Sequence, residues 1–181
     1  MTKFNPDIYH RRSIRLKDYD YSQPGAYFVT IATYRRVFLF GEIKEQTLFL
    51  NLFGKAVQLY WEHIPSHYAN VLLDSFIIMP NHVHGIIIIS DSIPNAGAGL
   101  KPALTKPAST KRYALSEIVR AFKTFSAKQI NKIQGTPGIP AWQRNYYEHI
   151  VRNEEELHSI REYIENNVIA WKSDNENPEI N

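Results

Sequence analysis

Residues 76–89 read FIIMPNHVHGIIII, two apolar runs that a Pro-Asn pair separates. Runs of β-branched and aromatic residues interrupted by turn residues are typical of a β-hairpin, and here the turn falls at Pro80 and Asn81. Both runs are apolar at nearly every position. This pattern indicates two strands inside a sheet that is covered on both faces.

Two histidines, His82 and His84, open the second run. Residues i and i+2 of a strand point to the same face, so the two imidazoles are predicted to project side by side. Imidazole is a common ligand of divalent metals. A His-x-His pattern also occurs as two partly exposed histidines at a strand edge, but polar rings with such apolar flanks need partners. The pair is therefore a candidate metal site.

Composition bounds the kind of protein. The chain has 181 residues, a net charge of +3 and no cysteine, which predicts one domain and excludes disulfides, thiolate zinc sites and a cysteine nucleophile. No apolar run approaches the roughly 20 residues of a membrane span. The first residues are polar and basic, unlike a signal peptide. We expect a cytoplasmic protein without a membrane partner.

The order of predicted elements indicates the fold. Strands are expected at residues 26–33, 46–50, 71–79, 82–90 and 145–151, and helices at residues 51–67, 115–133 and 153–171. The first helix has an apolar stripe consisting of Leu52, Ala56, Leu59, Tyr60 and Ile64. The second has one consisting of Leu115, Ile118, Val119, Phe122, Phe125 and Ile130. This order predicts an α+β ferredoxin-like sandwich, a central antiparallel sheet with helices packed on it.

The last helix has a clear start. Asn153 is a good N-cap, and Glu156 three residues later completes a capping-box pattern. Its buried stripe is predicted to comprise Leu157, Ile160, Ile164, Val168 and Trp171. Tyr163 and Asn167 are one turn apart, so they lie on a common line along the edge of that stripe.

The expected organisation is a basic arm at residues 1–24, a domain at residues 25–172 and a polar tail at residues 173–181. The arm carries Arg11, Arg12 and Arg15, which fit either a solvated surface or phosphate contacts. We also assign Lys123 and Arg144 to a nucleic-acid-binding surface. Residues 91–112 are rich in Pro and Gly with several lysines, which fits a mobile loop or a basic flap over a phosphate chain.

These residues suggest one chemistry. A divalent metal on His82, His84 and the amide oxygen of Asn167 would leave positions open for phosphate oxygens, and such a metal acts as a Lewis acid. Tyr163 is a candidate nucleophile because tyrosine forms covalent intermediates. Tyr146 and Tyr147 are rival nucleophiles, since they too precede or lie near the last helix.

The pairing of Pro80-Asn81-His82-Val83-His84 with the late segment 163–167, YIENN, resembles the single-tyrosine HUH transposases. It resembles the REP-associated tyrosine transposases more closely. Further matching segments are GAYFVT at 25–30, FGE at 40–42, LSEIV at 115–119, FK at 122–123, WQRNYYEH at 142–149 and IVRNE at 150–154. Together they cover roughly residues 11–171.

This resemblance implies that Tyr163 is the nucleophile, that His82 and His84 bind Mg²⁺ or Mn²⁺, and that Asn167 is the polar residue one turn after the tyrosine. It also implies cleavage and rejoining of single-stranded DNA beside palindromic hairpins through a 5′-phosphotyrosine. The family often has Asn-Pro after the tyrosine, whereas here Val168 follows Asn167.

Two other functions fit the sequence. The chain could be a non-catalytic ferredoxin-like module that binds hairpin DNA or RNA, with structural histidines. A metalloenzyme acting on small molecules is disfavoured, because no acidic residue or third histidine stands at zinc-ligand spacing. We expect single-stranded DNA with a hairpin as the partner. The sequence leaves open whether the protein is a monomer or a homodimer.

Overall fold

The computed structural model describes residue 16, residues 19–91 and residues 113–171. Its main sheet has four antiparallel strands in the order β4-β5-β1-β6. These strands are β1 (Gly25–Ala32), β4 (Val71–Ile78), β5 (His82–Ile89) and β6 (Tyr147–Val151). The helices are α1 (Leu52–Glu62), α2 (Ile64–His67), α3 (Leu115–Gln134) and α4 (Glu154–Ala170). This order of strands and helices confirms the ferredoxin-like α+β prediction.

The predicted hairpin forms one half of the sheet, with β5 inside it and β4 at its edge, so only the second of the two apolar runs is an inner strand. The β4–β5 connection is residues 79–81, and the Met79 N–H donates to the His82 carbonyl at 2.8 Å. On its other side β5 pairs with β1 along their whole length, from Gly25 opposite Ile89 to Ala32 opposite His82. The turn at Pro80 and Asn81 is therefore confirmed, and β5 is an inner strand as its apolar sequence predicts.

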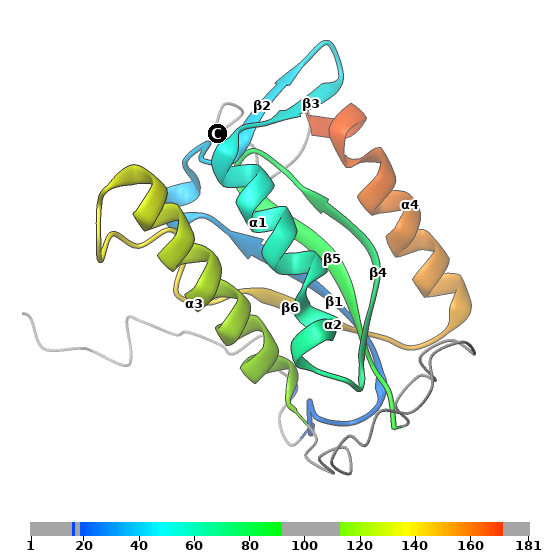
Figure 1. Ribbon diagram of the computed structural model, residues 1–181. Coiled ribbons are helices and arrows are strands. Elements are labelled where there is room, and N and C mark those ends of the chain that lie inside the picture. The colour runs from blue at the N-terminus through cyan, green and yellow to red at the C-terminus, as the bar shows by residue number, and fades with distance from the viewer. Residues whose placement is uncertain (1–15, 17–18, 92–112, 172–181) are drawn as a thin grey trace, which may run out of the picture.

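Helices α1 and α3 cover one face of the sheet, where they pack side by side (Figure 1). Their core includes Tyr27 and Val29 from β1, Val83 and Ile87 from β5, and Trp61 from α1, all fully buried. Burying each large apolar side chain contributes about 1.5–3 kcal/mol before the entropy cost. This layer forms the larger part of the core.

Helix α4 covers the opposite face. A second cluster joins Phe28 of β1 and Ile86 of β5 to Leu157 and Ile164 of α4. Because side chains alternate along a strand, the even-numbered residues of β5 face α4. His82 and His84 belong to that set, and the expectation that both faces of the sheet are covered is confirmed.

The helix predicted at residues 51–67 is two helices that meet at His63. Pro65 has no N–H to continue the hydrogen-bond ladder, which explains the break. The predicted apolar stripe was also wrong in part: Leu52 is 69% exposed and Leu59 is 53% exposed, while Val57 and Trp61 are fully buried. Both faces of this helix carry apolar residues, and only contact with the sheet and α3 selects one.

Other predicted boundaries also change. Phe125 of α3 is exposed, and the buried position one residue later is Ser126. Strand β6 begins at Tyr147 rather than at residue 145. The expected strand at 46–50 is half of a small hairpin between β2 (Gly41–Lys44) and β3 (Thr47–Leu50). Its turn residues Glu45 and Gln46 have positive φ, which the sequence does not reveal.

The helices of the described residues are all too short or too polar to cross a membrane.

Candidate functional site

Strand β5 presents His82 and His84 to α4 from the centre of the sheet. Both are buried, with 0% and 2% of their surface exposed. Their ring centroids lie 4.3 Å apart. The structure therefore brings the two imidazoles together on one face, as the His-x-His spacing predicts.

His82 is held as one neutral tautomer. Burial first, and then the positive charge of Arg36, lower the pKa of His82 from 6.5 to about 3. Its Nδ1 lies 2.8 Å from Oδ1 of Asn81, an oxygen that can only accept, so Nδ1 carries the proton. The Asn81 amide is oriented in turn by its Nδ2, which donates to the Arg36 carbonyl at 3.3 Å.

The other nitrogen of His82, Nε2, therefore bears a lone pair. It is buried, and among the described residues no hydrogen-bond partner reaches it. A histidine that binds a metal must be neutral and must direct a lone pair at the ion. A second group usually holds its opposite ring nitrogen. His82, with Asn81 behind it, meets both conditions.

His84 links the sheet to α4. Its Nδ1 lies 2.8 Å from Oγ1 of Thr30, the residue directly opposite on β1. Its Nε2 lies 3.2 Å from the hydroxyl of Tyr163. Phe28 stacks on the same imidazole, with ring centroids 5.5 Å apart, and also contacts the Tyr163 ring edge-on. The candidate nucleophile and a candidate metal ligand are thus direct neighbours.

Tyr163 and Asn167 of α4 and Trp171, the C-cap of this helix, lie on one line toward this site. The first contacts His84, and the Trp171 ring lies 6.0 Å from that of His82. Asn167 is between them along the helix and is only 1% exposed. It was expected at the edge of the buried stripe, and the structure places it inside. Its amide therefore faces the layer that holds the two histidines.

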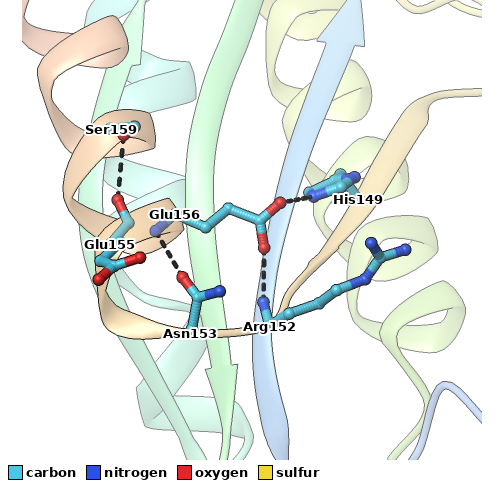
Figure 2. A network of polar contacts seen from close by, with 6 residues as sticks. All are labelled: His149, Arg152, Asn153, Glu155, Glu156 and Ser159. Carbon is cyan, nitrogen blue, oxygen red and sulfur yellow. Dashed lines mark hydrogen bonds and ion pairs between the residues drawn. The ribbon is translucent and has the colours of Figure 1, made fainter.

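Polar contacts at its first turns fasten α4 to the sheet (Figure 2). The Asn153 side chain accepts from the Glu156 N–H at 2.8 Å, which confirms the predicted N-cap. The Glu156 carboxylate accepts from the Arg152 N–H at 2.7 Å and contacts His149 of β6 at 2.6 Å. The hydrogen bond to the Arg152 N–H is the largest cause that lowers the pKa of Glu156.

A second anchor lies further along α4. The Arg161 guanidinium donates to both carboxylate oxygens of Asp74, at 2.7 and 2.6 Å. Asp74 lies within the irregular part of β4, between Leu73 and Phe76. Helix α4 is thereby joined to both edge strands of the sheet, β6 and β4, and Tyr163 lies between these two anchors and the helix end.

The rival tyrosines are placed differently. Tyr146 packs against the core under α1 and α3, away from the histidines. Tyr147 pairs with Thr30 on β1 and shares the face of His84, but one strand separates it from that histidine. Two strand spacings are about 10 Å. Tyr163, by contrast, contacts His84 directly through its hydroxyl.

The predicted nucleic-acid-binding residues are not brought together. Arg11, Arg12 and Arg15 lie outside the described residues. Arg144 is exposed in the segment before β6. Lys123 is directed inward instead: its ammonium donates to the carbonyls of Gln143, Arg144 and Asn145, and burial lowers the pKa of Lys123 to about 8. This ammonium holds the loop before β6 in place.

The donor set suits a metal that prefers few protein ligands. Within the described part of the chain, no group of three or more His, Cys, Asp or Glu side chains could hold a metal ion. Two imidazoles and one amide are what remain. Mg²⁺ usually binds through one or two carboxylates and completes its shell with waters and phosphate oxygens, so here the imidazoles and the amide would take the place of the carboxylates. The orphaned Nε2 of His82 is the observation that favours a metal here.

Sequence reasoning missed the residues that hold the histidines. Asn81 was read only as a turn residue, and Thr30 only as part of a strand. The position of Asn81 beside His82 is visible in the sequence, but its amide acts on Nδ1 because Arg36 holds its other end. Thr30 is 54 residues from His84, so only the strand register could reveal that contact.

No family model matches the chain. A protein of Haemophilus influenzae, described as uncharacterized, is 43% identical over 179 residues, which cover 96% of each chain.

Among solved structures, a REP-associated tyrosine transposase bound to a REP hairpin has a TM-score of 0.53 and 18% identity. The match covers 87% of this chain and 73% of that one, and at this identity it shows the fold. A candidate transposase of Deinococcus radiodurans has a TM-score of 0.46 and 18% identity, covering 84% of this chain and 95% of that one.

Proposed function

Because the chain belongs to the same family as the Haemophilus influenzae protein and has the fold of a REP-associated tyrosine transposase, we propose that it is a transposase-like enzyme. It cleaves and rejoins single-stranded DNA through Tyr163. One observation carries this proposal: the Tyr163 hydroxyl lies 3.2 Å from Nε2 of His84, beside a second histidine with a buried lone pair. A module that only bound DNA would have no need of that arrangement.

His82, His84 and Asn167 would hold Mg²⁺ or Mn²⁺. Such an ion supplies a Lewis acid that withdraws charge from a phosphate oxygen. Asn81 and Thr30 hold Nδ1 of the two imidazoles, which leaves Nε2 of each ring on the side of α4. In the present arrangement the Tyr163 hydroxyl contacts Nε2 of His84, so His84 would hold the ion through this nitrogen only with the hydroxyl placed elsewhere.

The chemical step is a phosphodiester exchange. The phenolic oxygen of Tyr163 gives its proton to water and forms a bond to the scissile phosphorus, while the bond from phosphorus to the 3′-oxygen breaks. The electron pair goes to that oxygen, which takes up a proton and leaves as a 3′-OH. The protein then carries a 5′-phosphotyrosine. In rejoining, a 3′-OH attacks this phosphotyrosine and restores the tyrosine hydroxyl, so no external energy source is needed.

The proposed substrate is a single strand beside a hairpin. The solved REP-associated tyrosine transposase is bound to a REP hairpin, and the likeness in fold supports a DNA hairpin as partner here. Arg11, Arg12, Arg15 and Arg144 are the proposed phosphate contacts. Each phosphate neutralised makes the affinity fall more steeply with salt.

The test is a covalent adduct. A labelled oligonucleotide with a palindromic hairpin is incubated with the protein and Mn²⁺ and is then run on a denaturing gel. We expect a protein–DNA band for the wild type, for Tyr146→Phe and for Tyr147→Phe, and none for Tyr163→Phe or with EDTA. An adduct that survives in Tyr163→Phe and disappears in Tyr147→Phe would assign the chemistry to the other tyrosine.

One observation favours the alternative, a hairpin-binding module without catalysis. The described residues lack a metal site of three His, Cys, Asp or Glu ligands. Such a module would bind the hairpin oligonucleotide with the same affinity in the wild type and in Tyr163→Phe, and it would form no adduct under any metal. The same gel, read beside a binding titration, separates the two functions.

A further inference from the structure

The segment after β1 has an unusual backbone. Arg35 and Arg36 have φ values of 57° and 56°, in the left-handed region that residues other than glycine rarely adopt. Such conformations persist only where surrounding contacts impose them, and they concentrate at functional sites. This segment lies against the turn that precedes His82.

Hydrogen bonds to the β4–β5 turn impose the conformation. The Thr33 N–H donates to the Asn81 carbonyl at 2.8 Å, and the N–H groups of Leu39 and Phe40 both donate to the Pro80 carbonyl at 2.9 Å. The segment thus wraps around the turn that carries Asn81. As a result, Phe38 is 43% exposed beside the site rather than buried in the core.

Phe38 is one end of a row of rings. It contacts Trp171 at 5.8 Å between centroids, and Trp171 contacts His82 at 6.0 Å. His82 is followed by His84 at 4.3 Å, and His84 by Tyr163 at 5.2 Å. The row therefore runs from an exposed phenylalanine to the candidate nucleophile.

Tyr147 is the other end. It is 44% exposed on the edge strand β6 and contacts Phe28 edge-on at 6.3 Å. Phe28 stacks on His84 and contacts Tyr163 at 6.1 Å. Two rows of contacting rings thus meet at Tyr163, and each row ends at an exposed ring, Phe38 in one and Tyr147 in the other.

The charge at the Phe38 end suits a polyanion. Arg35 and Arg36 stand three and two residues before Phe38 in the chain, and the Arg35 side chain is exposed. Arg144 is exposed three residues before Tyr147. Exposed aromatics beside basic side chains are the combination with which proteins hold unpaired bases and their phosphates.

We propose that Phe38 and Tyr147 stack on two bases of the single-stranded DNA, one on each side of the phosphate that Tyr163 attacks. This inference rests on the proposed function and specifies how its substrate is held. It also gives Tyr147 a binding role in place of the nucleophilic role that its sequence position suggested. The rings keep the strand extended across the site, because each holds a base away from its neighbour.

The test uses oligonucleotides with a single 2-aminopurine placed at successive positions, without metal, so that binding is read apart from cleavage. Stacking on an aromatic ring quenches this base. In the wild type we expect two quenched positions flanking the cleavage site. Phe38→Leu should abolish one and Tyr147→Leu the other, and each should weaken binding by about 5- to 150-fold.

The conservative variants separate stacking from packing. Phe38→Leu preserves an apolar contact with Trp171 but removes the ring. Phe38→Tyr and Tyr147→Phe each preserve a ring, so these two variants should retain both the quenching and the affinity of the wild type. Phe125→Leu is the matched control, because Phe125 is 53% exposed on α3 under the opposite face of the sheet. Equal quenching in wild type, Phe38→Leu and Tyr147→Leu would overturn the inference.

The adduct gel is run in parallel. If the wild type forms the adduct but Phe38→Leu and Tyr147→Leu bind the single strand as tightly as the wild type does, the stacking roles are refuted and the proposed function stands. Quenching that depends on both rings, without an adduct, would support this binding surface and refute the strand transferase. A wild type that does not bind the single strand overturns both.

Discussion

The hydroxyl of Tyr163 and Nε2 of His84 lie 3.2 Å apart, although 79 residues separate them in the chain. This hydrogen bond joins the last helix to the central strand at the residue that stacks on Phe28. A metal bound to His84 would need Nε2, the nitrogen that the Tyr163 hydroxyl contacts, because Nδ1 of His84 already contacts Thr30.

The first prediction concerns this competition. Tyr163→Phe keeps the ring but removes the oxygen that occupies His84 Nε2, so the variant should bind Mn²⁺ at least as tightly as the wild type. Mn²⁺ affinity can be measured by electron paramagnetic resonance without DNA. A clear loss of affinity in Tyr163→Phe would show that the hydroxyl helps to hold the metal, contrary to the site proposed here.

The second prediction concerns Asn81. Asn81→Ala removes the acceptor that keeps the proton of His82 on Nδ1, so Nε2 no longer has a fixed lone pair. Loss of such a supporting group typically reduces metal affinity by about 10- to 100-fold. Nitrogen-15 chemical shifts of His82 should show a mixture of tautomers, and Mn²⁺ titration should show the weaker binding.

Two variants control for this. Asn81→Asp retains an acceptor at the same place and should restore the single tautomer. Asn131→Ala removes an asparagine whose Nδ2 donates to the Ile139 carbonyl, on the other side of the sheet, and should leave Mn²⁺ binding unchanged. Wild-type affinity in Asn81→Ala would refute the role given to this amide.

The third prediction concerns the packing below the histidines. A Cβ at Gly85 would lie 2.3 Å from Cζ2 of Trp61 and 3.0 Å from Cβ of Phe76, so Gly85→Ala forces the indole to move. Overpacking of this kind lowers the free energy of unfolding by about 1–3 kcal/mol. Thermal or urea unfolding should measure the loss.

Trp61→Phe removes the part of the indole that the new methyl group meets. The loss in free energy of unfolding in the double variant should therefore be smaller than the sum of the losses in the two single variants, by about 0.5–3 kcal/mol. Strict additivity in this cycle would mean that the methyl group is accommodated elsewhere.

The fourth prediction is a pH dependence of stability. The hydrogen bonds from Arg161, opposed in part by burial, lower the pKa of Asp74. A carboxyl with a lowered pKa stabilises the fold fully above its unfolded pKa, about 3.9, and that contribution disappears as the pH falls through the folded pKa. The melting temperature of Asp74→Asn should therefore be below that of the wild type at pH 5–7, and the gap should close below about pH 4.

An exposed ion pair on the same helix provides the comparison. Glu162 contacts His158 at 3.3 Å with most of both side chains in solvent. Exposed pairs contribute little, so Glu162→Gln should melt close to the wild type throughout this pH range. A gap for Asp74→Asn that stayed constant down to pH 2 would assign its effect to packing rather than charge.

Some features of the site follow from the sequence because they depend on neighbours along the chain. The alternation of a strand puts His82 and His84 on one face, and the helical period puts Tyr163, Asn167 and Trp171 on one line. The cap at Asn153 follows from its side chain and from Glu156 three residues later. The residues in each of these relations are at most eight positions apart in the chain, so local backbone geometry determines it.

Other features follow only from tertiary structure. The register of β1 against β5 puts Thr30 on His84, and the docking of α4 puts Tyr163 on the same ring and buries Asn167. The sequence by itself determined the ferredoxin-like order of elements and the residue types of the site. Which ring nitrogen faces which partner was decided by contacts between segments 54 and 79 residues apart, because no local periodicity encodes how a sheet and a helix meet.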